Sequence, residues 1–320
     1  MPRKQAKNLA ASVRQRLLNI AKEQGEPFDL LLTQYGLERT LYRISVSEWA
    51  DQFLLKGALL FKRWHQVPRP PTRDVDLLSY GPAETDRLVE IFRALCSMDV
   101  EEDGLILGPA SVRAQEIREN NMYQGIRIKL SGDLDGARVP IQFDVGFGDV
   151  VTPEPEQIEF PTLLEFPAPR MRAYPVYTVI AEKLQALVVL GIANSRMKDY
   201  YDLWALSVNM ELELRPLRDA IASTFERRKT EIPGKLPVGL TRAFSADEAK
   251  LRQWAGFVSK NRLDESELTL EKVVDALSEF LSLPMEAARS EDKTGISLQY
   301  WPPGGPWKKR GEAVPELTIF

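Results

Sequence analysis

The sequence predicts an α+β fold, in which helices flank a sheet with antiparallel strands. In residues 8–50, and again from about residue 172 onward, apolar residues recur at the spacing of amphipathic helices. Between these parts, the runs at residues 111–117, 125–130 and 139–145 show the two-residue alternation or the β-branched content of strands. Strands that follow one another directly favour an antiparallel sheet over a doubly wound fold, in which strands and helices alternate.

The first 50 residues form the N-terminal helical segment. Val13, Leu17 and Leu18 share one helix face, and two further apolar clusters follow before residue 50. Turn residues at Gly25-Glu26-Pro27 and at Tyr35-Gly36 are expected to separate these helices.

Residues 51–168 are predicted to form the α+β core. A helix is expected from Gly57 towards Trp64, a proline loop at residues 68–71, a short strand at 74–78 and an amphipathic helix at 84–97, before the three strand-like runs. The single histidine, His65, follows the first of these helices, and we interpret it as a surface or capping residue.

Residues 169–289 are predicted to form a helical domain, with helices at 179–190, 198–208, 214–227, 246–258 and 268–281. Residues 290–320 are expected to form an irregular tail, because Trp301 is followed by Pro302-Pro303-Gly304-Gly305-Pro306. This tail could dock through Trp301 and Trp307.

The composition is that of a soluble globular protein. Of the 320 residues, 44% are hydrophobic and 28% are charged, which excludes a disordered chain. The single cysteine, Cys96, excludes an internal disulfide and a cysteine-rich zinc site, and its apolar surroundings predict a small core residue. No secretion signal is evident, and the apolar stretch at residues 184–192 is too short to span a bilayer. We therefore expect a cytoplasmic location and no membrane partner.

A formal net charge of −4 gives the chain no overall attraction to nucleic acid. A local basic groove could still bind it, and four groups of basic residues are candidates. The alternative is that most of them are solvated surface. The groups are Arg170 with Arg172, Arg196 with Lys198, Arg227-Arg228-Lys229, and Lys308-Lys309-Arg310.

The first motif with chemical content is Asp74-Val75-Asp76. On a strand, these two carboxylates point to the same side and repel each other. A divalent cation removes this penalty, because Mg²⁺ is typically held by one or two carboxylates together with substrate phosphates. A turn or a solvated strand edge is the alternative explanation for such a pair.

Three further residues support a metal and phosphate site. Gly57 ends an apolar run and opens a helix, where backbone N–H groups can approach a phosphate, although a turn or packing glycine is an equal alternative. Thr72 could direct its hydroxyl to the same phosphates. Asp144 is a single carboxylate within the apolar strand at 139–145, so it either faces solvent or joins Asp74 and Asp76 at a metal.

Two segments of the helical part carry charges that call for partners. Lys183 lies on an otherwise apolar helix, so it either points at an anion or extends its ammonium to solvent at the helix edge. In the second segment, Lys198, Asp199 and Asp202 share a helix face. They form a surface salt-bridge cluster, or Arg196 and Lys198 bind phosphates while Asp199 or Asp202 orients Lys183 or the attacking hydroxyl.

The order of these motifs resembles the DNA polymerase β-like nucleotidyltransferases and, more narrowly, the AbiEii/AbiGii toxin family. The resemblance covers roughly residues 8–285 and departs at Ala58, where the superfamily usually has serine or glycine. It rests on Lys56-Gly57-Ala58-Leu59-Leu60-Phe61, Thr72-Arg73-Asp74-Val75-Asp76-Leu77, Val179-Ile180-Ala181-Glu182-Lys183-Leu184-Gln185-Ala186-Leu187 and Arg196-Met197-Lys198-Asp199-Tyr200-Tyr201-Asp202-Leu203.

The resemblance implies metal-assisted nucleotidyl transfer on a polymerase β-like core. Two Mg²⁺ ions, or Mn²⁺ in their place, would be held by Asp74, Asp76 and Asp144. Lys183 would neutralise the departing pyrophosphate, with Asp199 and Asp202 also in the catalytic set. The nucleoside triphosphate (NTP) would be bound by Lys56, Gly57, Ala58, Thr72, Arg196 and Lys198.

The resemblance also implies a toxin of a toxin–antitoxin module, with a separately encoded winged-helix antitoxin and tRNA 3′ ends as the kind of acceptor. Two alternatives remain open from the residues. One is a protein nucleotidylyltransferase, which places the nucleotide on a protein hydroxyl. The other is a non-catalytic nucleotide-binding regulator, against which the intact charges at Asp74, Asp76, Asp144 and Lys183 argue.

Overall fold

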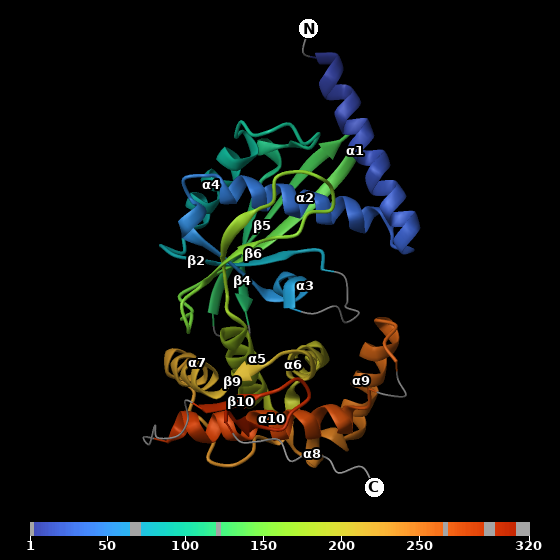
Figure 1. Ribbon diagram of the computed structural model, residues 1–320. Helices are drawn as coiled ribbons and strands as arrows, with labels where there is room; N and C mark the ends of the chain where they lie inside the picture. The colour runs from blue at the N-terminus through green and yellow to red at the C-terminus, as the bar shows by residue number, and fades with distance from the viewer. Residues whose placement is uncertain (1–2, 65–71, 120–122, 265–267, 291–297, 312–320) are drawn as a thin grey trace. The chain divides into compact units, whose positions relative to one another are not determined.

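The structure is a computed structural model that describes residues 3–64, 72–119, 123–264, 268–290 and 298–311 (Figure 1). His65 and the proline loop expected at residues 68–71 lie outside this described part. Contacts divide the chain into two units, which we call the sheet unit and the helical unit. The sheet unit comprises Met1–Arg63, Pro71–Asp149 and Pro155–Tyr174, and the helical unit comprises Trp64–Pro70, Val150–Glu154 and Pro175–Phe320.

The sheet unit is built on one mixed sheet with the strand order β3-β5-β6-β2-β1-β8-β7, and β4 pairs with β5. The pairs β2–β6 and β1–β8 are parallel and the other pairs are antiparallel, which confirms the predicted α+β class with a mixed sheet. The strands are β1 (Phe53–Lys56), β2 (Val75–Ser79), β3 (Ile106–Leu107), β4 (Arg113–Glu119), β5 (Tyr123–Leu134), β6 (Ala137–Phe147), β7 (Glu156–Glu159) and β8 (Arg170–Ala173).

Two helices cover one face of this sheet. The ring of Phe92 on α4 lies 5.2 Å from that of Phe143 on β6, and Gly36 on α2 packs directly on β6. A Cβ at Gly36 would lie 2.9 Å from Cγ1 of Ile141, so the glycine serves close packing inside the helix and does not interrupt it, contrary to our expectation. The helices of this unit are α1 (Arg3–Gln24), α2 (Phe28–Ser45), α3 (Phe61–Trp64) and α4 (Thr85–Cys96), with 3-10 turns η1 (Ala50–Gln52), η2 (Gly57–Leu60) and η3 (Pro109–Ser111).

Strand β6 alternates between the two faces of the sheet. Val139, Ile141 and Phe143 are almost fully buried on the face that carries α2 and α4. Gln142 and Asp144 point to the opposite face, because successive side chains of a strand alternate. The carboxylate predicted to be catalytic therefore lies on the face away from the two covering helices.

The sheet continues past the predicted boundary at residue 168. Strand β8 pairs in parallel with β1, and the backbone N–H of Tyr174 donates to the carbonyl of Leu55 at 2.9 Å. The N-terminal helices belong to the same unit as the sheet. Strand β8 escaped detection because it is only four residues long and contains Arg170 and Arg172, so it shows little apolar alternation.

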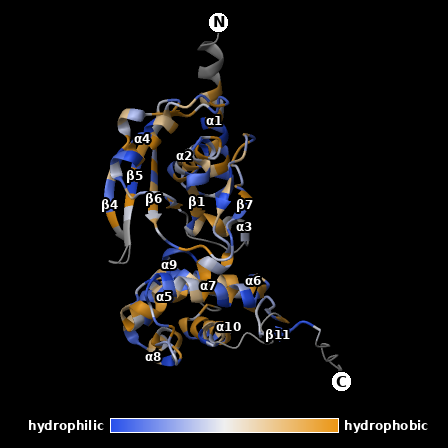
Figure 2. Ribbon diagram, turned by 90° about the vertical axis from the view of Figure 1, so that its left-hand side faces the viewer, coloured by the Kyte–Doolittle hydropathy of each residue, from blue (hydrophilic) through white to orange (hydrophobic). Residues whose placement is uncertain are grey.

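Among its described residues, the helical unit contains the five predicted helices and one further short one. Helix α7 packs against α5 and α10, and α10 packs against α6. Figure 2 shows hydrophobic residues on these helices beside hydrophilic ones, as in amphipathic helices that share a core. The elements are α5 (Val176–Leu190), η4 (Gly191–Ala193), α6 (Met197–Asn209), α7 (Leu214–Arg227), η5 (Val238–Leu240), α8 (Arg242–Ser245), α9 (Glu248–Lys260) and α10 (Leu270–Arg289).

The described part of the C-terminal stretch is regular, in contrast to the predicted irregular tail. Strand β10 (Gln299–Trp301) pairs with β9 (Leu212–Glu213) on one side and β11 (Lys308–Lys309) on the other. The proline and glycine residues form the turn of this hairpin. Trp301 is 2% exposed and its Nε1 donates to the carbonyl of Ser207 at 2.7 Å, while Nε1 of Trp307 donates to the carbonyl of Phe280 at 2.9 Å. Both tryptophans thus dock on the helical unit.

Within the described residues, one helical stretch, Val176–Ala193, is long and apolar enough to cross a membrane by length and composition. Our expectation that no such stretch exists was therefore too strict. The criterion is also met by core helices of globular domains, and half of this stretch is buried. Its buried residues include Val179, Leu184 and Leu187.

Candidate active site

Four charged residues form a row across neighbouring strands of the sheet unit. Lys56 on β1 pairs in register with Asp76 on β2, Asp76 pairs with Asp144 on β6, and Asp144 pairs with Arg127 on β5. Cross-strand partners in register point to the same face. The sheet therefore presents two adjacent carboxylates between two cations.

Asp74 lies in the bend immediately before β2, two residues ahead of Asp76. The hydrogen bond to Asp144 raises the pKa of Arg127, and the charges of Asp74 and Asp76 add to this effect. Thr72, half-buried, precedes Asp74. The three carboxylates predicted from the sequence are thus gathered near one guanidinium.

Arg127 is a residue of this site that the sequence analysis missed. Its Nε and Nη2 donate to the two oxygens of Asp144 at 2.8 and 2.6 Å. The sequence did contain a signal, because a basic residue between Ile126 and Ile128 on a strand calls for an anionic partner on the face of the sheet to which it points. The identity of that partner depends on the β5–β6 register, which the sequence does not reveal.

Gly57 is required by the position of Asp76. Its φ of +78° lies in the left-handed region. A Cβ at this position would lie 2.7 Å from Cγ of Asp76 and 2.8 Å from its Cβ. Gly57 is therefore a turn glycine, as in one of our two interpretations, and it also makes room for the carboxylate of Asp76.

The neighbours of Gly57 differ in their surroundings. Lys56 is 5% exposed, and its Nζ lies 3.7 Å from Oδ2 of Asp149. This ammonium is therefore held inside the sheet unit. Ala58 is half-buried in η2.

Asp76 and Asp144 offer the type of ligand atom that a magnesium site needs, because Mg²⁺ binds carboxylate oxygens in proteins. Asp76 and Asp144 lie side by side on parallel strands. As the side chains lie, however, the described residues contain no group of three histidine, cysteine or acidic residues that could hold a metal ion. Both oxygens of Asp144 accept hydrogen bonds from Arg127, so a metal ion at Asp144 would compete with this guanidinium.

A second charged cluster lies in the helical unit. Lys183 on α5 donates to Asp199, and its Nζ lies 3.0 Å from Oδ2 of Asp202, both on α6. Burial disfavours the ammonium, but the charges and hydrogen bonds of Asp199 and Asp202 outweigh it, so the pKa of Lys183 is raised above its usual value. Lys183 thus points at carboxylates of its own unit.

The other basic residues of this segment are more exposed. Nη1 of Arg196 lies 3.7 Å from Oδ2 of Asp199, and its side chain is 41% exposed. Lys198 is half-buried on the first turn of α6. Arg196 and Lys198 are therefore accessible in this unit to an anionic ligand.

The basic run Arg227-Arg228-Lys229 is not a solvated patch throughout. Arg228 is largely buried, with Nη2 lying 3.2 Å from Oε1 of Glu182 and Nη1 donating to Oε1 of Gln185 at 3.0 Å. Arg228 therefore fixes the helix that carries Lys183. Its role is structural support of α5.

Replacement of Lys183 by methionine is expected to destabilise the helical unit by about 3 kcal/mol, because it leaves Asp199 and Asp202 without their common cation. A raised pKa means that the stabilisation is complete below the ordinary lysine pKa of about 10.4 and is lost only at higher pH. In urea unfolding at pH 7, 8.5 and 10, the free energy of unfolding of Lys183→Met should therefore lie below that of the unmodified protein by the same amount at each pH. Lys260→Met, at an exposed position, is the control; an equal loss in both variants, or none in Lys183→Met, contradicts this role.

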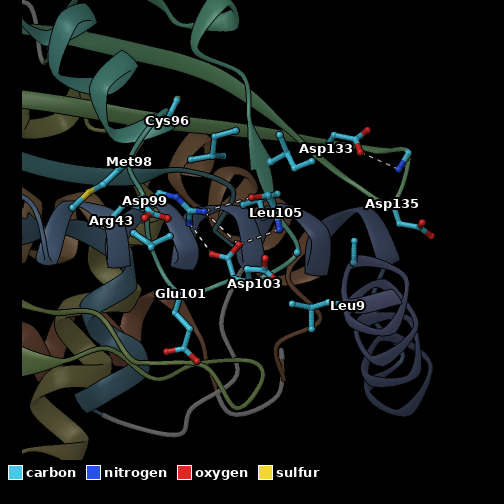
Figure 3. Close-up of a pocket in the computed structure, with 17 residues that line it drawn as sticks. Leu9, Arg43, Cys96, Met98, Asp99, Glu101, Asp103, Leu105, Asp133 and Asp135 are labelled. Carbon is cyan, nitrogen blue, oxygen red and sulfur yellow. Dashed lines mark hydrogen bonds and ion pairs between the residues drawn. The ribbon is translucent and has the colours of Figure 1, made fainter. Parts of the chain in front are cut away.

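A separate cavity of about 620 Å³ lies in the sheet unit and contains none of the predicted site residues. Figure 3 shows Arg43 pointing toward Asp103 there, with Nη1 donating to Oδ2 at 2.7 Å. The hydroxyl of Tyr35 donates to the carbonyl of Asp103 at 2.6 Å. Cys96 also lines this cavity, and burial raises the pKa of its thiol to about 11. This buried network holds the chain between α4 and β3 in place.

The chain was compared with known proteins. A model of the nucleotidyl transferase AbiEii toxin family of type IV toxin–antitoxin systems matches residues 39–281. No curated protein matches. Among solved structures, JHP933 from Helicobacter pylori and a second H. pylori protein, provisionally named a nucleotidyltransferase, each match with a TM-score of 0.41 and 14% identity. They cover 78% of this chain and 87% and 90% of their own chains.

Proposed function

Because this chain belongs to the AbiEii family of nucleotidyl transferase toxins of type IV toxin–antitoxin systems, we propose that it transfers a nucleoside monophosphate from an NTP to an RNA acceptor in a metal-dependent reaction. The proposed acceptor is the 3′ end of a tRNA. The chain is thus a nucleotidyltransferase, and a type IV system implies a separate antitoxin partner.

The observation that carries this proposal is the row of charges on the sheet. Asp76 and Asp144 lie in register on adjacent parallel strands, and Gly57 leaves room for the carboxylate of Asp76. Like charges side by side are unfavourable on a sheet unless a cation joins them. A fold that places them together is therefore suited to binding Mg²⁺, or Mn²⁺, and with it the phosphates of a nucleotide.

In the proposed reaction, an oxygen of the acceptor hydroxyl forms a bond to the α-phosphorus of the NTP. The bond from that phosphorus to the bridging oxygen breaks, pyrophosphate leaves, and the hydroxyl proton is lost to solvent. Asp74, Asp76 and Asp144 would hold the divalent cations, which would neutralise phosphate charge and lower the pKa of the acceptor hydroxyl. Positioning and charge neutralisation dominate the catalysis of phosphoryl transfers.

The residues of this chain divide these tasks in the proposal. In the sheet unit, Asp144 is assigned to the attacking side of the reaction. In the helical unit, Lys183, which Asp199 and Asp202 orient, is assigned to the neutralisation of phosphate charge. Arg196 and Lys198, which are accessible in the helical unit, are assigned to phosphate contacts. The backbone at Gly57 and Ala58 and the hydroxyl of Thr72 are assigned to the NTP, whereas Lys56, paired with Asp149, supports the row.

The test is incubation of the purified protein with each of the four [α-³²P]NTPs and Mg²⁺. The acceptors are total tRNA, tRNA with a periodate-oxidised 3′ end, and total cell protein. We expect label in intact tRNA alone, and none with EDTA. Label only in protein would identify a protein nucleotidylyltransferase and refute the tRNA proposal, and full labelling in EDTA would refute metal dependence.

A further inference from the structure

Both oxygens of the Asp144 carboxylate accept hydrogen bonds from one guanidinium, and Oδ1 also accepts a longer one from Nε2 of Gln142 at 3.5 Å. Nε of Arg127 donates to Oδ1 of Asp144 at 2.8 Å, and Nη2 donates to Oδ2 at 2.6 Å. This bidentate arrangement is the strongest that arginine and a carboxylate form. The two residues lie directly opposite each other on β5 and β6, so the contact is built into the register of the two longest strands.

The same contact occupies the oxygens that a divalent cation needs. Mg²⁺ binds carboxylate oxygens at about 2.1 Å and tolerates little departure from octahedral geometry. A guanidinium that holds both oxygens of Asp144 leaves the cation no direct approach on that side. This agrees with the finding that no metal-ready group of three ligands is present among the described residues.

Arg127 also interacts with the other carboxylates of the row. The charges of Asp74 and Asp76 act on its guanidinium together with that of Asp144. A cation at this place lowers the repulsion between the neighbouring carboxylates of Asp76 and Asp144, as a bound metal ion would.

We propose that Arg127 is a displaceable counter-ion, which holds Asp144 while the carboxylate row is without metal and releases it when a divalent cation binds. This inference rests on the proposed metal-dependent function. Arg127 is then a positioning residue, because it acts through Asp144. It keeps the carboxylate ordered, and it competes with the metal for the same oxygens, so it sets the affinity of the site.

The test is a titration of the full chain with Mn²⁺, followed by electron paramagnetic resonance of the free ion. We expect Arg127→Gln to bind Mn²⁺ about tenfold more tightly than the unmodified protein, because the cation no longer displaces a charge-assisted hydrogen bond. In EDTA, Arg127→Gln should melt at a lower temperature, and Mn²⁺ should remove most of this difference. Lys129→Gln is the matched control, because Lys129 is an exposed cation two residues along β5 and on the same face.

A second measurement uses the unmodified chain. In a ¹⁵N spectrum, the Nε–H signal of Arg127, identified by its absence in Arg127→Lys, should shift when Mg²⁺ is added. Two results would overturn the counter-ion role of Arg127 and leave the proposed function standing. One is that Arg127→Gln binds Mn²⁺ no more tightly than the unmodified protein, and the other is that the Arg127 signal does not shift while metal binds. If no variant binds Mn²⁺ with or without NTP, both this inference and the metal-dependent function fail.

Discussion

Replacing Asp76 with asparagine is expected to reduce nucleotidyl transfer by about a thousandfold, because the site loses several kcal/mol of cation binding at the reacting phosphate. Asp76 lies at the centre of the row, between Lys56 and Asp144. The unfolding free energy should change little, because the substitution removes both a repulsion from Asp144 and an attraction to Arg127. A loss of activity without a loss of stability is the signature of a functional charge.

The measurement is single-turnover incorporation of [α-³²P]NTP into tRNA, with the melting temperature of each protein recorded beside it. Asp133→Asn is the control, because Asp133 is an exposed carboxylate of the same sheet, at the end of β5. Its activity should equal that of the unmodified protein. Full activity of Asp76→Asn would remove Asp76 from the catalytic site.

Replacing Gly57 with alanine is expected to reduce transfer by about a hundredfold, because a Cβ at this position displaces the carboxylate of Asp76 by about 1 Å. The protein should also lose about 2 kcal/mol of stability from backbone strain and the clash together. The two substitutions thus affect the same carboxylate in different ways. Asp76→Asn removes its charge, and Gly57→Ala shifts its position.

Gly136→Ala separates the two costs of the Gly57 change. Gly136 has the same φ of +78°, in the β5–β6 turn, but a Cβ there would meet no atom within 4 Å. We expect it to lose about 1 kcal/mol of stability from strain alone and to keep full activity. If Gly136→Ala loses as much activity as Gly57→Ala, the effect comes from general destabilisation, and the link between Gly57 and Asp76 is refuted.

The long elements could be predicted from periodicity alone. Helices α4, α5, α6 and α7 follow the predicted spans closely. Helix α10 continues to Arg289, past the predicted end at residue 281, and strands β5 and β6 extend at both ends beyond the predicted runs at 125–130 and 139–145. The short elements could not be predicted in this way. Strands β3, β7, β8, β9 and β10 have two to four residues, and all of them except β7 pair with a strand that is distant in the sequence. For the same reason, the Pro-rich turn after Trp301 closes a hairpin on β9, where we expected an irregular tail.

Within the site, the sequence by itself determined which residue types are unusual in their surroundings. Asp74, Asp76, Asp144 and Lys183 stand out because a charge in an apolar element is costly without a partner. The tertiary structure decided which partner each one has. Lys183 is held by Asp199 and Asp202, and Asp144 is held by Arg127, which no local pattern connects to it.

Gly57 shows the same division. Its place after an apolar run left two interpretations, a helix start that contacts phosphate and a turn or packing glycine. Only the register of β1 and β2 shows that it must lack a Cβ because Asp76 occupies that space. A local sequence pattern indicates how much free energy it costs to bury a side chain or to adopt an unusual backbone conformation. This cost depends on the residue and its near neighbours. Compensation for that cost comes from strands and helices far along the chain, so it is decided by register and packing.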